Sequence, residues 1–150
     1  MFRYERPQAG RVRQFHQFGV ECFGMAGPDI DAEVIALTAA IWRDLGIADS
    51  VRLEINSLGT FESRQQHKKA LIDYFEANNS QLDADSQRRL LSNPLRILDS
   101  KNPDMQPLLE AAPQLSDYMD EEATEHFQQL CQMLDQLRIS YRVNHRLVRG

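Results

Sequence analysis

Residues 28–56, PDIDAEVIALTAAIWRDLGIADSVRLEIN, decide the fold class, because two hydrophobic periodicities follow one another in this stretch. In its first part, apolar residues recur every three or four positions, at Ile30, Val34, Leu37, Ile41 and Leu45. This spacing predicts an amphipathic helix over residues 28–46, with Asp29 as the candidate N-cap residue and Gly46 as its C-terminal stop.

The second part of the stretch, VRLEIN at residues 51–56, alternates apolar and polar side chains. Alternation with a period of two is typical of a strand with one buried face. One face would carry Val51, Leu53 and Ile55, and the other Arg52, Glu54 and Asn56. The predicted fold therefore has a strand directly after the helix.

The segment before the helix mixes aromatic residues with arginine around a PQAG turn. Residues 1–6 and 12–24 contain few helix signals, and Pro7 and Gly10 interrupt the segment between them. We predict a β-hairpin whose long loop spans about residues 5–13. The hairpin, the helix and the strand together predict an α+β unit over residues 1–60.

Residues 61–138 have the apolar spacing of a series of helices with polar faces. The predicted helices run from Phe61 to Phe75, from Leu82 to Leu91, from Pro103 to Ala112, and from an acidic first turn at 120–122 to Leu137. Strand alternation resumes at residues 139–143. The predicted organisation is a partial core at 1–60, a helical insertion domain at 61–138 and a return strand at 139–150.

The composition is that of a soluble globular protein, with 42% hydrophobic and 26% charged residues in a chain of 150. No apolar run approaches the roughly 20 residues that a membrane span needs. The arginine-rich start is not followed by the apolar segment of a signal peptide. We therefore expect a cytoplasmic protein that has no membrane partner.

The two cysteines, Cys22 and Cys131, stand far apart, and neither lies in a CxxC or Cys/His spacing. The four histidines are scattered in the same way. We expect both cysteines to be buried thiols rather than a disulfide or metal ligands, and we expect no structural metal.

The formal net charge of -5 hides two basic ends. Residues 1–25 hold four arginines against two glutamates, and residues 139–150 hold three arginines and no acid. Such asymmetry suggests that both ends line one anion-binding site. An ordinary solvated surface is the alternative interpretation.

Six segments along the chain resemble segments of one known family, and they occur in the same order as in that family. They are FRYE (2–5), RVRQFHQFGVECFG (11–24), GPDIDAEVIAL (27–37), NSLG (56–59), NPLRILDSKNP (93–103) and VNHRLVRG (143–150). Together they resemble the catalytic domain of bacterial histidyl-tRNA synthetases. FRYE and the following arginine-rich loop correspond to motif 2 of the class II synthetases, and LVRG opens a histidine-specific motif.

The resemblance implies that the chain is a fragment of the catalytic domain. Motif 1 of the family would precede Met1, and motif 3 and the anticodon-binding domain would follow Gly150. The implied fold is part of the antiparallel sheet of a class II synthetase with a mainly helical insertion. The implied parent is a homodimer, and the isolated chain is expected to be inactive.

The resemblance also assigns the basic ends to ATP. Arg3 would contact the α-phosphate and the histidine carboxylate, Glu5 the adenine end, and Arg11 the outer phosphates. Arg149 would reach the α-phosphate from the opposite side, so Arg3 and Arg149 are the catalytic candidates. Guanidinium groups suit this role because they are always charged and form forked hydrogen bonds to phosphate and carboxylate oxygens. Mg²⁺ would accompany the ATP phosphates.

Gln17 and Glu21 stand four positions apart, which places them on one face if QFHQFGVE is a strand. The resemblance implies that Gln17 binds the polar backbone groups of histidine and that Glu21 accepts a hydrogen bond from its imidazole. The alternative is that Glu21 simply faces solvent.

The helical segment corresponds to the family's insertion, which approaches the acceptor arm of tRNA(His). Its first part is the more basic, and phosphate contacts would come from Lys68, Lys69, Arg88 and Arg89, with Arg96 and Lys101 as further candidates. Exposed basic residues on helices are also often just solvated.

The leading functional hypothesis is therefore that the chain is part of a histidine–tRNA ligase. Its partners would be ATP, histidine and tRNA(His), and it would not bind DNA. A non-catalytic synthetase-like regulatory protein is the alternative, as is a module that binds tRNA only. The regulatory relatives need not keep the catalytic residues, whereas six residues of this chain fit the enzyme's pattern, namely Arg3, Glu5, Arg11, Gln17, Glu21 and Arg149.

Overall fold

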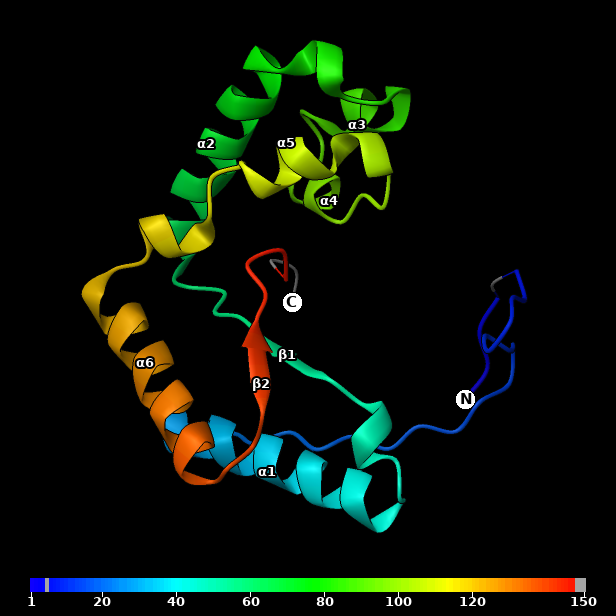
Figure 1. Ribbon diagram of the computed structural model, residues 1–150, viewed down its shortest axis with the longest axis vertical. Coiled ribbons are helices and arrows are strands. Elements are labelled where there is room, and N and C mark those ends of the chain that lie inside the picture. The colour runs from blue at the N-terminus through cyan, green and yellow to red at the C-terminus, as the bar shows by residue number, and fades with distance from the viewer. Residues whose placement is uncertain (5, 148–150) are drawn as a thin grey trace.

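The structure is a computed structural model that describes residues 1–4 and 6–147. Most elements of the chain are helices, and two short strands pair with each other (Figure 1). The elements are α1 (Pro28–Asp44), β1 (Leu53–Ile55), α2 (Phe61–Ala77), α3 (Ala84–Arg89), α4 (Leu95–Leu98), α5 (Gln106–Glu110), α6 (Glu121–Gln136) and β2 (Tyr141–Val143). Single turns of 3₁₀-helix lie at Ala48–Ser50, Asn79–Gln81, Pro103–Met105 and Leu115–Tyr118. This mixture of helix and strand confirms the α+β class.

Two helices and two strands form one part of the molecule, which we call the sheet body. Strand β1 pairs with β2 in parallel, with Ile55 opposite Val143, and α1 packs along α6. The buried side chains of this body are Ala32, Ile55, Leu130 and Leu134. A parallel pair needs a crossover connection, and α6 supplies its final part immediately before β2.

The segment from α2 to the 3₁₀ turn Leu115–Tyr118 forms the second part, which we call the helical body. It lies at the top of Figure 1, above α1, α6 and the strands. Its core is tightly buried, with Leu71 and Phe75 at 0% exposure and Ile97 and Met105 at 1%. The two bodies therefore have separate hydrophobic cores.

This packing bears on the predicted division of the chain. Helix α6, which the sequence analysis placed in the insertion at 61–138, shares its core with α1 and both strands. The boundaries at residues 60 and 138 remain a prediction. In the structure, the buried residues of the helical core lie between residues 71 and 112.

Helix α1 confirms the predicted stop at Gly46 but not the predicted N-cap. Gly46 has φ 68°, and Ile47 N–H bonds to Trp42 O at 3.0 Å, so a left-handed residue closes the helix as a Schellman motif. The N-cap residue is Gly27 rather than Asp29. Proline is pre-organised for the first helical position, so the helix begins at Pro28, as the predicted range 28–46 has it, and Asp29 becomes part of its acidic first turn.

Helix α6 has the acidic start that its sequence predicts. Asp120 is the N-cap residue, and its carboxylate accepts a hydrogen bond from Ala123 N–H at 2.8 Å. His126 Nε2 lies 2.8 Å from Asp31 Oδ2 and links α6 to α1. Arg138, with φ 55°, ends the helix in the left-handed conformation and turns the chain into β2.

Helix α2 continues to Ala77, past the predicted Phe75, whereas the next two predicted helices of the helical body are shortened or divided. The prediction over Leu82 to Leu91 corresponds to α3, and α4 was not predicted. The prediction over Pro103 to Ala112 is divided into a 3₁₀ turn and α5. Pro107 has no N–H to continue a helix from the preceding turn, which accounts for this division.

No helix among residues 1–4 and 6–147 combines the length and the apolar character that crossing a membrane requires.

Candidate functional site

The arginine-rich start folds as a short antiparallel hairpin. Arg3 N–H bonds to Arg13 O at 2.9 Å, and Phe15 N–H bonds to Met1 O at 3.0 Å. The loop turns tightly at Gly10, which has φ 72° and lies between the mutually hydrogen-bonded residues Gln8 and Arg11. The base of the predicted hairpin is therefore confirmed, and it brings the backbone of Arg3 beside Arg13.

Two of the hairpin arginines stack on aromatic rings. The Arg3 guanidinium carbon lies 4.1 Å from the centroid of the Phe15 ring, and that of Arg13 lies 5.9 Å from the Tyr4 ring. The attraction between a guanidinium group and the face of a ring helps to fix the position of the side chain. The N–H donors of a guanidinium group lie in its plane, so stacking and binding of an oxyanion at the edge are compatible.

Two predicted site residues, Glu5 and Arg149, lie outside the residues that the structure describes. The hairpin holds the predicted residues Arg3, which is half-buried, and Arg11, which is exposed. The structure thus places the two predicted phosphate-binding arginines of motif 2 on one hairpin.

The strand predicted over QFHQFGVE is wrong for this structure. Residues 15–27 have no regular secondary structure, and Gln17 and Glu21 are both exposed. A strand needs hydrogen-bonding neighbours, and the described residues offer none to this segment beyond the base of the hairpin. The structure therefore places Gln17 and Glu21 on an exposed irregular segment rather than on one face of a strand.

The same segment leaves large apolar side chains in solvent. Phe18 is 74% exposed and Phe23 is 82% exposed. Cys22 is also exposed, so the expectation of a buried thiol is wrong there, whereas Cys131 is half-buried.

The hydrogen bond with Cys131, with a contribution from burial, raises the pKa of Tyr141 to about 12.

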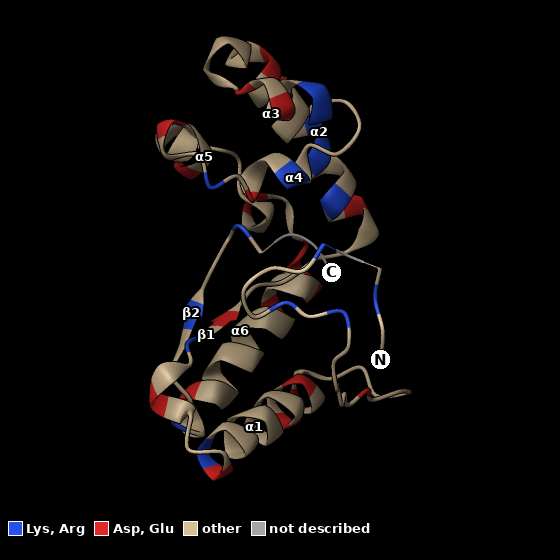
Figure 2. Cartoon of the chain, turned by 90° about the vertical axis from the view of Figure 1, so that its right-hand side faces the viewer, with Lys and Arg blue, Asp and Glu red and all other residues tan. Residues whose placement is uncertain are grey.

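The helical body carries its basic residues on several helices. Figure 2 shows lysine and arginine on α2 and α4 in the helical body, while acidic residues stand out on α1. On α2, Lys68 is half-buried and Lys69 is exposed. Arg96 on α4 and Lys101 after it are exposed as well.

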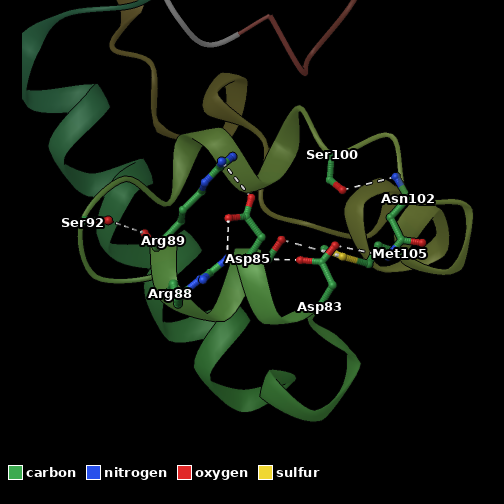
Figure 3. A network of polar contacts seen from close by, with 9 residues as sticks. Asp83, Asp85, Arg88, Arg89, Ser92, Ser100, Asn102 and Met105 are labelled. Carbon is green, nitrogen blue, oxygen red and sulfur yellow. Dashed lines mark hydrogen bonds and ion pairs between the residues drawn. The ribbon is translucent and has the colours of Figure 1, made fainter.

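The predicted arginine pair on α3 is held by an acid that the sequence analysis did not single out. Asp85 accepts Arg88 at 3.2 Å and Arg89 at 2.8 Å, as Figure 3 shows. The Arg88 side chain is 77% exposed, so solvent screens this pair. The i, i+3 and i, i+4 spacing to Asp85 was the signal that could have revealed both contacts.

Asp83 organises the turn before α3. Its Oδ1 accepts Ser86 N–H at 2.8 Å, and its Oδ2 accepts Asn102 Nδ2 at 3.2 Å (Figure 3). These hydrogen bonds, the one from Ser86 N–H above all, lower the pKa of Asp83. The residue thus joins α3 to the loop that precedes α5.

Residues after β2 connect the two bodies, which the sequence analysis missed. Asn144 Nδ2 donates to Glu54 Oε2 at 2.7 Å, and Asn144 N–H donates to Ile55 O at 3.0 Å. The Arg146 side chain instead reaches the helical body, where it bonds to Leu98 O at 2.9 Å. No spacing in the sequence indicates these partners, because they are distant in the chain.

His67 is a buried histidine on α2, with 2% exposure. Its Nε2 lies 2.9 Å from Pro113 O and can donate a hydrogen bond to it, and its ring packs 5.8 Å from that of Tyr118. Burial removes water from the imidazole and lowers the pKa of His67. The side chain is therefore a neutral structural element of the helical body.

This histidine predicts a pH dependence of stability. Because the folded pKa lies below the ordinary value of 6.5, the unfolded chain takes up the proton first as the pH falls. The contribution of His67 to the free energy of unfolding is fully present above pH 6.5. It is lost as the pH falls from 6.5 through the lower pKa of the folded state. Urea denaturation at about pH 7.5 and about pH 5 should show this loss, with a smaller pH effect in His67→Gln.

His145→Gln is the matched control, since His145 is exposed. It should keep the pH dependence of the wild type. An unchanged pH dependence in His67→Gln would show that other groups cause it.

Among residues 1–4 and 6–147, no three or more histidine, cysteine, aspartate or glutamate side chains gather closely enough to hold a metal ion.

Comparison with known proteins agrees with the resemblance seen in the sequence. A family model described as histidyl-tRNA synthetase matches residues 1–150. The crystal structure of the apo histidyl-tRNA synthetase of S. aureus is similar to this chain, with a TM-score of 0.61 and 34% sequence identity. The match covers 85% of this chain and 29% of the S. aureus chain, so this chain spans less than a third of that protein. Because the family model matches over the full 150 residues, the chain belongs to the histidyl-tRNA synthetase family.

Proposed function

We propose that this chain is part of a histidine–tRNA ligase, which activates histidine with ATP and passes the histidyl group to tRNA(His). The observation that carries the proposal is the hairpin with Arg3 stacked on Phe15 at 4.1 Å, in a chain that belongs to the family. In the first step, the histidine carboxylate attacks the α-phosphate, a new bond from oxygen to phosphorus forms, and pyrophosphate leaves. In the second step, a ribose hydroxyl of the tRNA end attacks the carbonyl and AMP leaves.

The proposed roles of the basic residues follow from the charge that this reaction develops. The attack brings two anions together, so cationic donors near the α-phosphate lower the barrier. Arg3 contacts the α-phosphate and the carboxylate, Arg11 contacts the outer phosphates, and Arg149 approaches the α-phosphate from the other side. Glu5 contacts the adenine end of ATP.

The proposed histidine pocket uses Gln17 and Glu21. The Gln17 amide binds the polar backbone groups of the amino acid, and the Glu21 carboxylate accepts the imidazole N–H. A site that satisfies a polar substrate group rejects amino acids that lack it, because its own polar group would be left unpaired. Both side chains are exposed in the described structure, so the pocket needs further groups around residues 15–27.

This arrangement has a consequence for the chain by itself. We propose that residues 1–150 alone do not form histidyl-adenylate, because Gln17 and Glu21 are exposed on an irregular segment in the part of the chain that the structure describes. The enzyme would take ATP as its Mg²⁺ complex, so the metal enters with the phosphates. We further propose that the enzyme is a cytoplasmic homodimer.

The helical body is the proposed contact for the tRNA acceptor arm, through Lys68, Lys69, Arg88 and Arg89. Since Asp85 pairs with Arg88 and Arg89, it competes with phosphate for both arginines. The Asp85→Asn variant should therefore bind an acceptor-arm minihelix severalfold more tightly than the wild type. Lys69→Gln should bind less tightly, and its salt dependence should have a slope smaller by about one. Titration of the chain over a salt series measures both.

The matched control is Arg43→Gln, because Arg43 is exposed on α1 in the sheet body. It changes the net charge as Lys69→Gln does and should leave the slope almost unchanged. Equal effects of the two variants would show that binding follows net charge rather than the helical body. Histidine-dependent exchange of pyrophosphate into ATP tests the activation step.

A further inference from the structure

Arg146 joins the end of β2 to the helical body through all three nitrogens of its guanidinium group. Nε donates to Leu98 O at 2.9 Å, Nη2 to Ser100 O at 3.0 Å, and Nη1 to Gln106 Oε1 at 2.8 Å. Leu98 is the last residue of α4, Ser100 lies in the loop that follows it, and Gln106 opens α5. In Figure 1 the chain after β2 rises from the strands toward the helical body.

The side chain of Gln106, which accepts from Arg146, is oriented by hydrogen bonds of its own. Gln106 Nε2 donates to Ser100 O at 3.1 Å and to Asn102 O at 2.8 Å, which turns its Oε1 toward Arg146. Three acceptors in fixed positions match the planar fork of a guanidinium group. Lysine offers one nitrogen on a flexible chain and cannot satisfy all three positions. The site is therefore specific for arginine.

The backbone of Arg146 is held from the sheet side. Its N–H donates to Asn144 Oδ1 at 3.0 Å, while Asn144 Nδ2 donates to Glu54 Oε2 at 2.7 Å. Asn56 Nδ2 also donates to Leu147 O at 3.1 Å. A continuous path of hydrogen bonds thus runs from β1, through the turn after β2, to the helical body.

We propose that Arg146 is a positioning residue that fixes the helical body to the end of β2, in the stretch of sequence that leads to the proposed catalytic residue Arg149. Arg149 follows Arg146 by three positions. The catalytic consequence rests on the proposed function, in which Arg149 meets the α-phosphate. A catalytic group displaced by about 1 Å can cost about a hundredfold in rate.

The test uses the enzyme that carries this chain. Arg146→Lys should lower kcat of histidine-dependent pyrophosphate exchange by about tenfold to a hundredfold, with KM for ATP and histidine within about threefold of the wild type. Gln106→Ala should change kcat in the same direction. The double variant should be little slower than Arg146→Lys alone, because both changes remove the same link. Arg52→Lys is the control, since Arg52 is exposed beside β1, and it should behave as the wild type.

Hydrogen exchange provides a second measurement that does not depend on activity. In Arg146→Lys, amides at 95–106 should exchange faster, while amides in α1 keep their wild-type rates. An unchanged kcat in an active enzyme, or faster hydrogen exchange in α1 as well, would overturn the positioning role. Unchanged hydrogen exchange at residues 95–106 would overturn the link between Arg146 and the helical body. A wild-type enzyme without histidine-dependent pyrophosphate exchange would instead contradict the proposed function. Amide hydrogen exchange would still decide whether Arg146 holds the helical body.

Discussion

The Arg3→Ala variant of the enzyme that carries this chain should form histidyl-adenylate about a hundredfold to a thousandfold more slowly than the wild type. That loss is typical when one preorganised donor is removed from a developing charge. Arg3 is half-buried and stacked on Phe15, so its guanidinium group is positioned before the reaction begins. Single-turnover measurement of adenylate formation isolates this step from the release of charged tRNA.

Two further variants separate charge, geometry and simple loss of an arginine. Arg3→Lys keeps the charge but not the planar fork, so its rate should fall between those of alanine and arginine. Arg6→Ala removes an exposed arginine from the same loop and should retain almost the full rate. If Arg3→Ala and Arg6→Ala formed adenylate equally fast, Arg3 would not be catalytic.

The Phe75→Ala variant should lower the free energy of unfolding of the helical body by about 3–5 kcal/mol. Phe75 is fully buried in the core of that body, next to Tyr74, whose ring centroid lies 5.4 Å away. Truncation removes apolar burial and leaves a cavity that rigid neighbours cannot fill completely. Urea denaturation followed by circular dichroism at helical wavelengths measures the change.

Phe61→Ala is the matched control, because Phe61 begins the same helix but is 69% exposed. Its effect should stay within about 0.5 kcal/mol. Comparable losses in the two variants would mean that helix propensity, rather than the core, determines the stability of α2.

The helices that the sequence predicted best are those whose signals are local. The apolar period and Gly46 predicted α1 and its end, and the acidic turn at 120–122 predicted the start of α6. Local signals also limited the prediction, since α4 is only a four-residue helix and carries no period of its own. The strand over QFHQFGVE failed for the opposite reason, because a strand forms only where neighbours supply hydrogen bonds.

The candidate site shows the same limit. The sequence indicated an arginine cluster at the start of the chain, and the structure places Arg3 and Arg11 on one hairpin. It did not indicate the contacts of Arg146, because their partners lie 40 to 48 positions away. Asp85 was within reach of sequence reasoning, since its contacts follow helical spacing.

Exchange of labelled pyrophosphate into ATP by the enzyme that carries this chain, with each amino acid offered in turn, tests whether the Arg3 hairpin belongs to a histidine-activating site. We expect exchange that depends on histidine and that falls by about a hundredfold or more in Arg3→Ala. We also expect Glu21→Gln to weaken the preference for histidine, because an amide replaces the carboxylate that accepts the imidazole N–H. Exchange that is absent with histidine, or that is equally fast in Arg3→Ala, would contradict the claim that this hairpin belongs to a histidine-activating site.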